Sequence, residues 1–170
     1  IRDSNASNVV DGDAARDVVV GDNGQAIFDS AGVLSEIRTL VPTIGGDDEI
    51  LVGDGDDVVL GGFGTDHISV LQATGQQVGG DTGDDVMLGD NGSALFDTST
   101  GQSVLTSIAS SDPEQGARDL IFAGDGSDIV LGGSGPDDID AGTDQGADII
   151  LGDNGLALFD PVNGVSVIRS

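Results

Sequence analysis

The chain contains no cysteine, tryptophan or tyrosine, and basic residues are scarce. Without cysteine no disulfide or cysteine nucleophile can form, and cysteine usage gives no indication of the redox compartment. Only 5 Lys and Arg stand against 31 Asp and Glu, which gives a formal net charge of −26. This balance argues against nucleic acid as a partner, because each phosphate contact requires a Lys or Arg.

Long hydrophobic runs and catalytic motifs are also missing. No apolar run approaches the roughly 20 residues of a membrane span, so the sequence predicts no span. The chain holds a single histidine and neither an HExxH nor a G-x-S-x-G motif, and we predict that it is not an enzyme. We interpret the lone His67 as a solvated residue on the outer side of a strand. Because the chain opens at Ile1 without a signal peptide, we expect a slice of a longer protein.

Few aromatic residues and a high net charge are together typical of disordered segments. In this chain, however, 37% of the residues are hydrophobic, and Val, Ile and Leu form short runs that a disordered tail lacks. A compact fold must also overcome the repulsion among its acidic residues. A fold that needs bound cations to offset its charge reconciles these observations.

A nine-residue pattern of glycine and aspartate repeats along the chain. Residues 61–69 (GGFGTDHIS) and 132–140 (GGSGPDDID) both match G-G-x-G-x-D-x-U-x, in which U is apolar. Further blocks of this length place an aspartate at the sixth position, at Asp17, Asp48, Asp57, Asp66, Asp85, Asp119, Asp128, Asp137 and Asp148. The eighth position is apolar at Val19, Phe28, Ile50, Val59, Ile68, Met87, Phe96, Ile121, Val130, Ile139, Ile150 and Phe159, with Gln77 of the degenerate block 70–78 as the exception. This ladder predicts an all-β fold of short parallel strands that bury one side chain per block.

A second repeat, GDNG followed by an apolar segment, recurs at 20–29, 88–97 and 151–160. It divides the chain into a partial unit, two full units and the start of a further unit, at 1–29, 30–97 (nonapeptides 43–97), 98–160 (nonapeptides 114–160) and 161–170. The sixth positions of the GDNG blocks are Ala26, Ala94 and Ala157. We therefore interpret these blocks as structural turns, with metal ligation by Asp22, Asp90 or Asp153 as the alternative.

The nonapeptide supplies the ligands that calcium requires. Calcium takes about six to eight oxygens from carboxylates and carbonyls, and glycine lets a turn aim its carbonyls inward. Successive blocks of a two-sheet stack alternate between the sheets, so that aspartates eighteen residues apart, or nearly so, share an edge. The predicted clefts are Asp48/Asp66, Asp66/Asp85, Asp119/Asp137 and Asp128/Asp148, and the candidate turn glycines are Gly53, Gly55, Gly62, Gly64, Gly124, Gly126, Gly133 and Gly135.

These nonapeptides resemble those of the RTX (repeats-in-toxin) family of secreted bacterial proteins. The near-matches VGDGDDVVL (52–60) and AGDGSDIVL (123–131) extend the likeness, which covers residues 12–29, 43–97 and 114–160. The resemblance implies a right-handed parallel β-roll in which the sixth-position aspartates and turn carbonyls bind calcium between adjacent turns. It also implies type I secretion and folding outside the cell.

The blocks of the form D-U-U-U-G carry more apolar residues than a free-standing roll needs. Their flanking residues Val58 and Leu60, Ile129 and Leu131, and Ile149 and Leu151 would point outward as an apolar stripe. The segments after the GDNG blocks, with a glycine turn followed by alternating apolar residues, predict hairpins or widened turns of the stack. We expect them to cover the stripe, with self-association into a fibre or array as the alternative.

The sequence thus predicts a calcium-stabilised structural repeat of a large extracellular or cell-surface bacterial protein, such as an adhesin, surface-layer component or filament. The alternative is an RTX tail of a secreted enzyme or toxin whose activity lies elsewhere.

Overall fold

The computed structural model of the chain describes residues 9–71, 76–77, 82–162 and 164–170. Eighteen strands and no helix are found in these ranges, which confirms the predicted all-β class. The same residues include no helix of the length and hydrophobicity that crossing a bilayer requires. Residues 1–8 of the predicted first unit lie outside the described residues.

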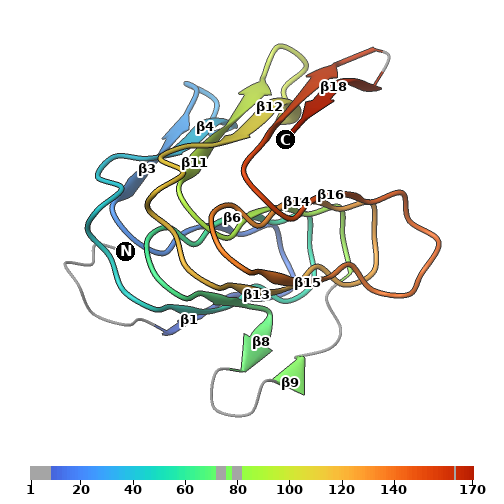
Figure 1. Cartoon of the computed structure of the whole chain (residues 1–170). Helices are drawn as coiled ribbons and strands as arrows, with labels where there is room; N and C mark the ends of the chain where they lie inside the picture. Colours follow the sequence, from blue (N-terminus) through green and yellow to red (C-terminus); the bar gives the residue numbers. More distant parts are fainter. Residues whose placement is uncertain (1–8, 72–75, 78–81, 163) are drawn as a thin grey trace.

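Two parallel sheets of five strands each form the lower and middle layers of the molecule (Figure 1). The lower sheet runs in the order β1 (Val9–Asp11), β5 (Glu49–Leu51), β7 (His67–Ile68), β13 (Leu120–Phe122) and β15 (Asp138–Asp140). The middle sheet runs β2 (Val18–Val20), β6 (Val58–Leu60), β10 (Val86–Leu88), β14 (Ile129–Leu131) and β16 (Ile149–Leu151). The strands are only two or three residues long, because aspartate and glycine flank the apolar residues of each block.

A third, antiparallel sheet lies above the middle sheet (Figure 1). This upper sheet consists of three hairpins, in the order β3 (Gly24–Phe28), β4 (Leu34–Thr39), β11 (Gly92–Asp97), β12 (Val104–Ser110), β17 (Leu156–Asp160) and β18 (Gly164–Arg169). Each hairpin follows a GDNG sequence, so the hairpin alternative of the sequence prediction is correct and the widened turn is wrong. The three predicted unit boundaries after Asp29, Asp97 and Asp160 fall in the turns of these hairpins.

The chain passes alternately between the lower and middle sheets before it rises into the upper one. We call one lower strand and the middle strand that follows it a rung. One rung precedes the hairpin β3–β4, and two rungs precede each of the hairpins β11–β12 and β17–β18. The connections place corresponding residues in register, as in the row Ile50, Ile68, Ile121 and Ile139.

The eighth-position residues fill the space between the lower and middle sheets. Ile50, Ile68 and Ile121 meet Val59 and Met87 there in one buried cluster. The three phenylalanines of the predicted apolar series do not lie there, and that part of the prediction is wrong. Phe28, Phe96 and Phe159 lie on the upper sheet, because their blocks leave the stack and pair as hairpins.

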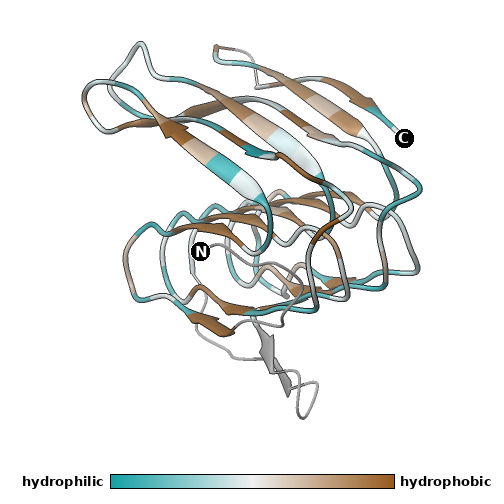
Figure 2. Cartoon of the chain, turned by 90° about the vertical axis from the view of Figure 1, so that its left-hand side faces the viewer, coloured by the Kyte–Doolittle hydropathy of each residue, from teal (hydrophilic) through white to brown (hydrophobic). Residues whose placement is uncertain are grey.

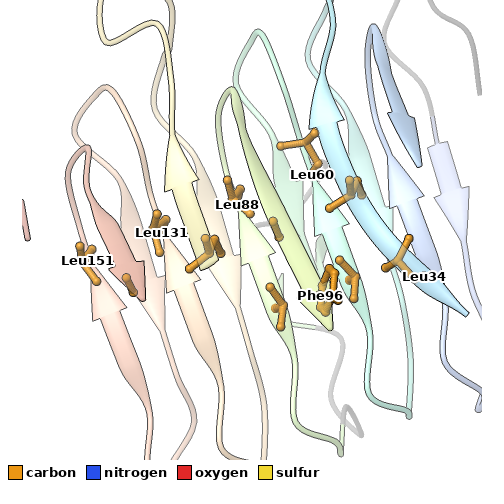
Figure 3. Packing of buried hydrophobic residues seen from close by; sticks show 12 residues of the cluster. Leu34, Leu60, Leu88, Phe96, Leu131 and Leu151 are labelled. Atoms are coloured by element: carbon orange, nitrogen blue, oxygen red, sulfur yellow. The ribbon is translucent and has the colours of Figure 1, made fainter. Parts of the chain in front are cut away.

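A second core joins the middle sheet to the upper sheet. Leu60, Leu88 and Leu131 rise from the middle strands and pack against hairpin residues such as Leu34 and Phe96 (Figure 3). The apolar stripe predicted from the D-U-U-U-G blocks is therefore covered by the chain's own hairpins. Figure 2 shows the same arrangement as hydrophobic strands facing one another across the layers.

The described residues of the block 70–78 add no strand to either parallel sheet. The described residues of this block form β8 (Val70–Leu71) and β9 (Gln76–Gln77), which pair with each other in a separate two-stranded sheet. Residues 72–75 and 78–81 lie outside the described residues. Consequently the rung that begins with β7 in the lower sheet is completed by β10 in the middle sheet. The predicted assignment of blocks to alternate sheets is therefore wrong by one block after residue 69.

Candidate metal centre

The sixth-position aspartates form two ladders, one at the N-terminal ends of the strands of each parallel sheet. In the lower sheet the backbone N–H of Asp48 donates to Asp66 Oδ1 at 2.9 Å, and that of Asp66 donates to Asp119 Oδ1 at 2.8 Å. The N–H of Asp119 then donates to Asp137 Oδ1 at 3.1 Å. Each carboxylate thus receives a hydrogen bond from the equivalent residue of the neighbouring strand, which fixes the direction of its second oxygen.

The middle-sheet ladder has the same connectivity. Backbone N–H groups donate along the series Asp17, Asp57, Asp85, Asp128 and Asp148, each to the Oδ1 atom of the next, over distances of 2.6–3.1 Å. All nine aspartates predicted from the sequence therefore belong to one of the two ladders.

Three of the four predicted carboxylate pairs are adjacent in the ladders, and one is not. Asp48/Asp66, Asp119/Asp137 and Asp128/Asp148 are neighbours. The pair Asp66/Asp85 was predicted wrongly, because Asp66 lies in the lower ladder and Asp85 in the middle one. The cause is the β8–β9 segment, which adds residues without adding a strand to either stack.

The second carboxylate oxygen is the feature that points to a cation. The Oδ2 atoms of Asp57, Asp66, Asp119, Asp128 and Asp137 are buried and accept no hydrogen bond among the described residues. An ionised carboxylate oxygen without a donor is costly in such a place. The five oxygens therefore have the surroundings expected of metal ligands.

Burial also raises the pKa of these carboxyls. It raises the pKa of Asp119 to about 9, with the charges of Asp90 and Asp137 acting in the same direction. Burial likewise holds the pKa of Asp66 well above its usual range, helped by the charge of Asp119. Burial brings the pKa of Asp57 and that of Asp128 to about 6. A nearby cation would reverse these shifts, because opposite charge favours the ionised form.

Backbone carbonyls lie beside the free oxygens of the lower ladder. A methyl group placed on Gly89 would meet both Asp119 Oδ2 and the carbonyl oxygen of Gly132. One placed on Gly132 would meet Asp137 Oδ2 and the carbonyl oxygen of Gly152. The absence of side chains at these glycines therefore leaves a space bounded by a carboxylate oxygen and a carbonyl oxygen. Sequence reasoning missed this role, although these glycines regularly follow the D-U-U-U run.

The glycines that were predicted as turn residues have the expected backbone conformation. Gly62 and Gly64 have φ values of 118° and 134°, and Gly133 and Gly135 have values of 110° and 137°. Gly53, Gly55, Gly124 and Gly126 are also in the positive-φ region, where a side chain is strained. The structure thus places glycines where the turns between strands need them.

No side-chain cluster of the usual metal-site kind is present among the described residues, where no three His, Cys, Asp or Glu side chains converge. The donors at the ladder are instead one carboxylate oxygen and one backbone carbonyl from neighbouring turns. Such an all-oxygen set fits a hard cation such as calcium and does not fit zinc, which prefers nitrogen and sulfur.

The aspartates of the first two GDNG sequences have a structural role. Asp22 accepts hydrogen bonds from the backbone N–H of Gly46 at 3.0 Å and of Phe63 at 2.6 Å, and so it ties two turns together. Asp90 does the same with Ala117 and Ser134. This supports the interpretation of these blocks as structural turns. Asp153, in the last block, is exposed.

His67 is buried, with 9% of its surface exposed, and the prediction of a solvated residue is wrong. The segment β8 contacts β5 and β13, the strands on either side of β7, and so covers this part of the lower sheet. Burial lowers the pKa of His67, which favours the neutral imidazole.

Comparison with family models, curated proteins and solved structures finds no match for this chain. The functional argument therefore rests on the residues and geometry described above.

Proposed function

We propose that the chain is a calcium-stabilised structural repeat module of a large extracellular bacterial protein, such as an adhesin, a surface-layer component or a filament. In this proposal the rungs are turns of a right-handed parallel β-roll of the RTX type. The observation that carries it is the set of five buried Oδ2 atoms, of Asp57, Asp66, Asp119, Asp128 and Asp137, that accept no hydrogen bond among the described residues.

The ladders suit calcium better than other common cations. Calcium accepts carboxylate and carbonyl oxygens in variable number and flexible geometry, whereas magnesium demands a near-ideal octahedron and keeps several waters. The repeating pair of one Oδ2 atom and one glycine carbonyl, as at Asp119 and Gly132, supplies such oxygens. The residues that would hold calcium are the ladder aspartates, and the bound ion would supply positive charge beside carboxylates whose pKa burial raises, as at Asp66 and Asp119.

The charge of the chain supports coupling of calcium binding to folding. A net charge of −26 opposes compaction, and the ladders bring carboxylates from neighbouring strands together. Metal binding free energy then contributes directly to folding free energy. A chain of this kind stays unfolded where calcium is scarce and folds after secretion, where calcium is abundant.

The layered architecture favours a structural role over an enzymatic one. Both parallel sheets and the hairpin sheet extend by adding equivalent units side by side, as the registers Ile37↔Ala94 and Ile108↔Ala157 show. Units that meet through the same contacts build a stiff rod, and a stiff rod suits a spacer or filament.

Circular dichroism and a metal count test the proposal. We expect little β-structure in chelator at pH 7 and cooperative folding when millimolar calcium is added, with several ions bound per chain by atomic emission. Magnesium at the same concentration is the control, and it should give weaker folding. An unchanged spectrum and melting temperature in chelator would sink the proposal.

A further inference from the structure

The three sheets do not end at the same place along the stack. The lower and middle sheets have five strands each among the described residues, and the upper sheet has six. The pattern of packing shows where the difference lies. Gly24 of β3 lies against Val20 of β2, Gly92 of β11 against Leu88 of β10, and Gly155 of β17 against Leu151 of β16.

The second strand of each hairpin should then lie over the next middle strand. β4 contacts β6, as this rule requires. β12 lies between β11 and β17, and so it lies over β14, the strand between β10 and β16. β18 lies beyond β17, but the described middle sheet has no strand beyond β16. The upper sheet therefore overhangs by one strand.

The exposure of equivalent residues shows the consequence of this overhang. Registers within the hairpins make Ile37, Ile108 and Ile168 equivalent, because each faces an alanine at Ala26, Ala94 or Ala157. Ile37 and Ile108 are fully buried, whereas Ile168 is 50% exposed. Val165 on the same strand is 47% exposed, while Leu34 at the equivalent place of β4 is buried.

The edge below the overhang is also open. A methyl group on Gly21, Gly61, Gly89 or Gly132 would meet a carbonyl of the next rung and an aspartate Oδ2 atom, but one on Gly152 would meet nothing within 4 Å. Ile150 on the last middle strand is 46% exposed. β15, β16 and the underside of β18 thus form a ledge. The equivalent positions beneath β4 and β12 are filled by β6 and β14, but the described residues place no strand beneath β18.

We propose that this ledge binds one further rung of the same repeat class, a polypeptide segment that adds one strand beside β15 and one beside β16. The inference rests on the proposed repeat function and specifies its partner. The segment needs an aspartate before each strand to continue the two ladders. It also needs the D-U-U-U-G pattern in its second strand, because the outer apolar residues must fill the space under Val165 and Ile168. Residues 111–133 contain β13 and β14, the rung that occupies the equivalent position beneath β12, and they have these features.

A rigid second copy of the chain does not fit the ledge. At the opposite end of the stack β1, β2 and β3 end together, with β3 directly over β2. If β2 of a second copy paired with β16, its β3 would occupy the place already taken by β18. Pairing of β3 with β18 would instead leave the rung position empty. The occupant is therefore a rung without a hairpin above it.

The test is a graft that supplies the rung. Ser170 is equivalent to Ser110, so a copy of residues 111–133 is joined directly after Ser170 and measured in calcium by hydrogen exchange. The N–H of Ile149 donates toward β14, to the Asp128 carbonyl at 2.7 Å, so strand alternation places the N–H of Ile150 on the open edge. We expect the Ile150 amide to exchange at least tenfold more slowly in the grafted chain. The matched control carries Ile129→Asp and Leu131→Asp in the grafted copy only, and it should give no slowing.

Two further variants complete the design. Ile168→Asp in the grafted chain should restore fast exchange, whereas Val162→Asp, at the exposed tip of the same hairpin, should not. Unchanged Ile150 exchange in a grafted chain that folds in calcium overturns the inference and leaves the calcium proposal intact. Protection that is equal in chelator and in calcium supports the ledge and counts against the calcium proposal. Dimerisation of the ungrafted chain that Ile168→Asp abolishes would show a second copy as the occupant, and it would overturn the inference.

Discussion

If calcium folds this chain as proposed, acid should be able to replace it, and the buried Asp119 sets the size of the effect. Burial raises the pKa of Asp119 to about 9 from an ordinary value of 3.8. A carboxyl whose pKa is higher in the folded state stabilises the fold below its unfolded pKa, and that contribution is lost as the pH rises towards the folded pKa. Without a cation, raising the pH therefore destabilises the chain.

The magnitude is comparable with the stability of a whole domain. Each pH unit between the unfolded pKa and the working pH costs about 1.4 kcal/mol, so holding Asp119 protonated at pH 7 costs about 4 kcal/mol. Asp66 has its pKa raised in the same direction and adds to this cost. A typical domain is stable by only about 5–15 kcal/mol. We therefore expect an unfolded chain in chelator at pH 7 and recovery of about 3 kcal/mol from Asp119 alone on lowering the pH to 5.

The assay is far-UV circular dichroism in chelator from pH 8 to pH 5, at low protein concentration because the isoelectric point is about 4.1. Acid also reduces the general repulsion among surface carboxylates, and 1 M sodium chloride at pH 7 controls for this because salt screens exposed charges.

Asp119→Asn removes the titrating group but keeps an acceptor for the N–H of Asp66. This variant should be more structured than the unchanged chain in chelator at pH 7 and gain less from calcium. Asp138→Asn, an exposed change on the neighbouring strand, should alter neither property. Folding by salt alone, or an Asp119→Asn profile that follows the unchanged chain, would refute the reasoning.

Two further pairs of substitutions, each with a matched control, test the architecture by chemical denaturation in calcium. Gly132→Ala should destabilise the fold by about 1–3 kcal/mol, because the added methyl meets Asp137 Oδ2 and the Gly152 carbonyl. Gly152→Ala meets nothing within 4 Å and should be neutral or slightly stabilising, and equal losses from both would contradict the packing described for the rungs. Leu131→Ala should cost about 2–5 kcal/mol, because this side chain is fully buried between the middle and upper sheets. Leu95→Ala on the exposed face of the upper sheet should change stability by about 0.5 kcal/mol or less, and a similar loss at both sites would count against the second core.

The repeat pattern was sufficient to predict the parallel strands and the members of both aspartate ladders. A period of nine residues with one aspartate and one apolar side chain fixes which residues repeat, and local turn chemistry fixes where each strand ends. The neighbours Asp48 and Asp66 followed directly from their spacing. The apolar residues flanking the middle strands also predicted that something covers them, and Leu60 and Leu131 are covered by hairpins.

The pairing of Asp66 with Asp119 could not be predicted from the sequence. The two residues are 53 positions apart, and the segment between them contains β8, β9 and the hairpin β11–β12. Counting in nines assumes that every block adds a strand to the stack, and the sequence does not show which block leaves it. Long-range register depends on such insertions, whereas local spacing does not. The burial of His67 was missed for the same reason, since it depends on where β8 lies.

The two cores stabilise different contacts of the molecule. The core between the parallel sheets, together with the aspartate ladders, joins one rung to the next. Under the proposed function, the ladders need a cation to compensate their buried charge. The core beneath the hairpins joins the rungs to the upper sheet through apolar side chains such as Leu60 and Leu131. If calcium occupies the ladders as proposed, its loss should weaken the contacts between rungs, and the six-stranded upper sheet then loses the apolar surface on which it packs. Under the proposed function, ladders that need calcium and hairpins that do not would form one cooperative structure, so that loss of calcium from the ladders would unfold the whole chain.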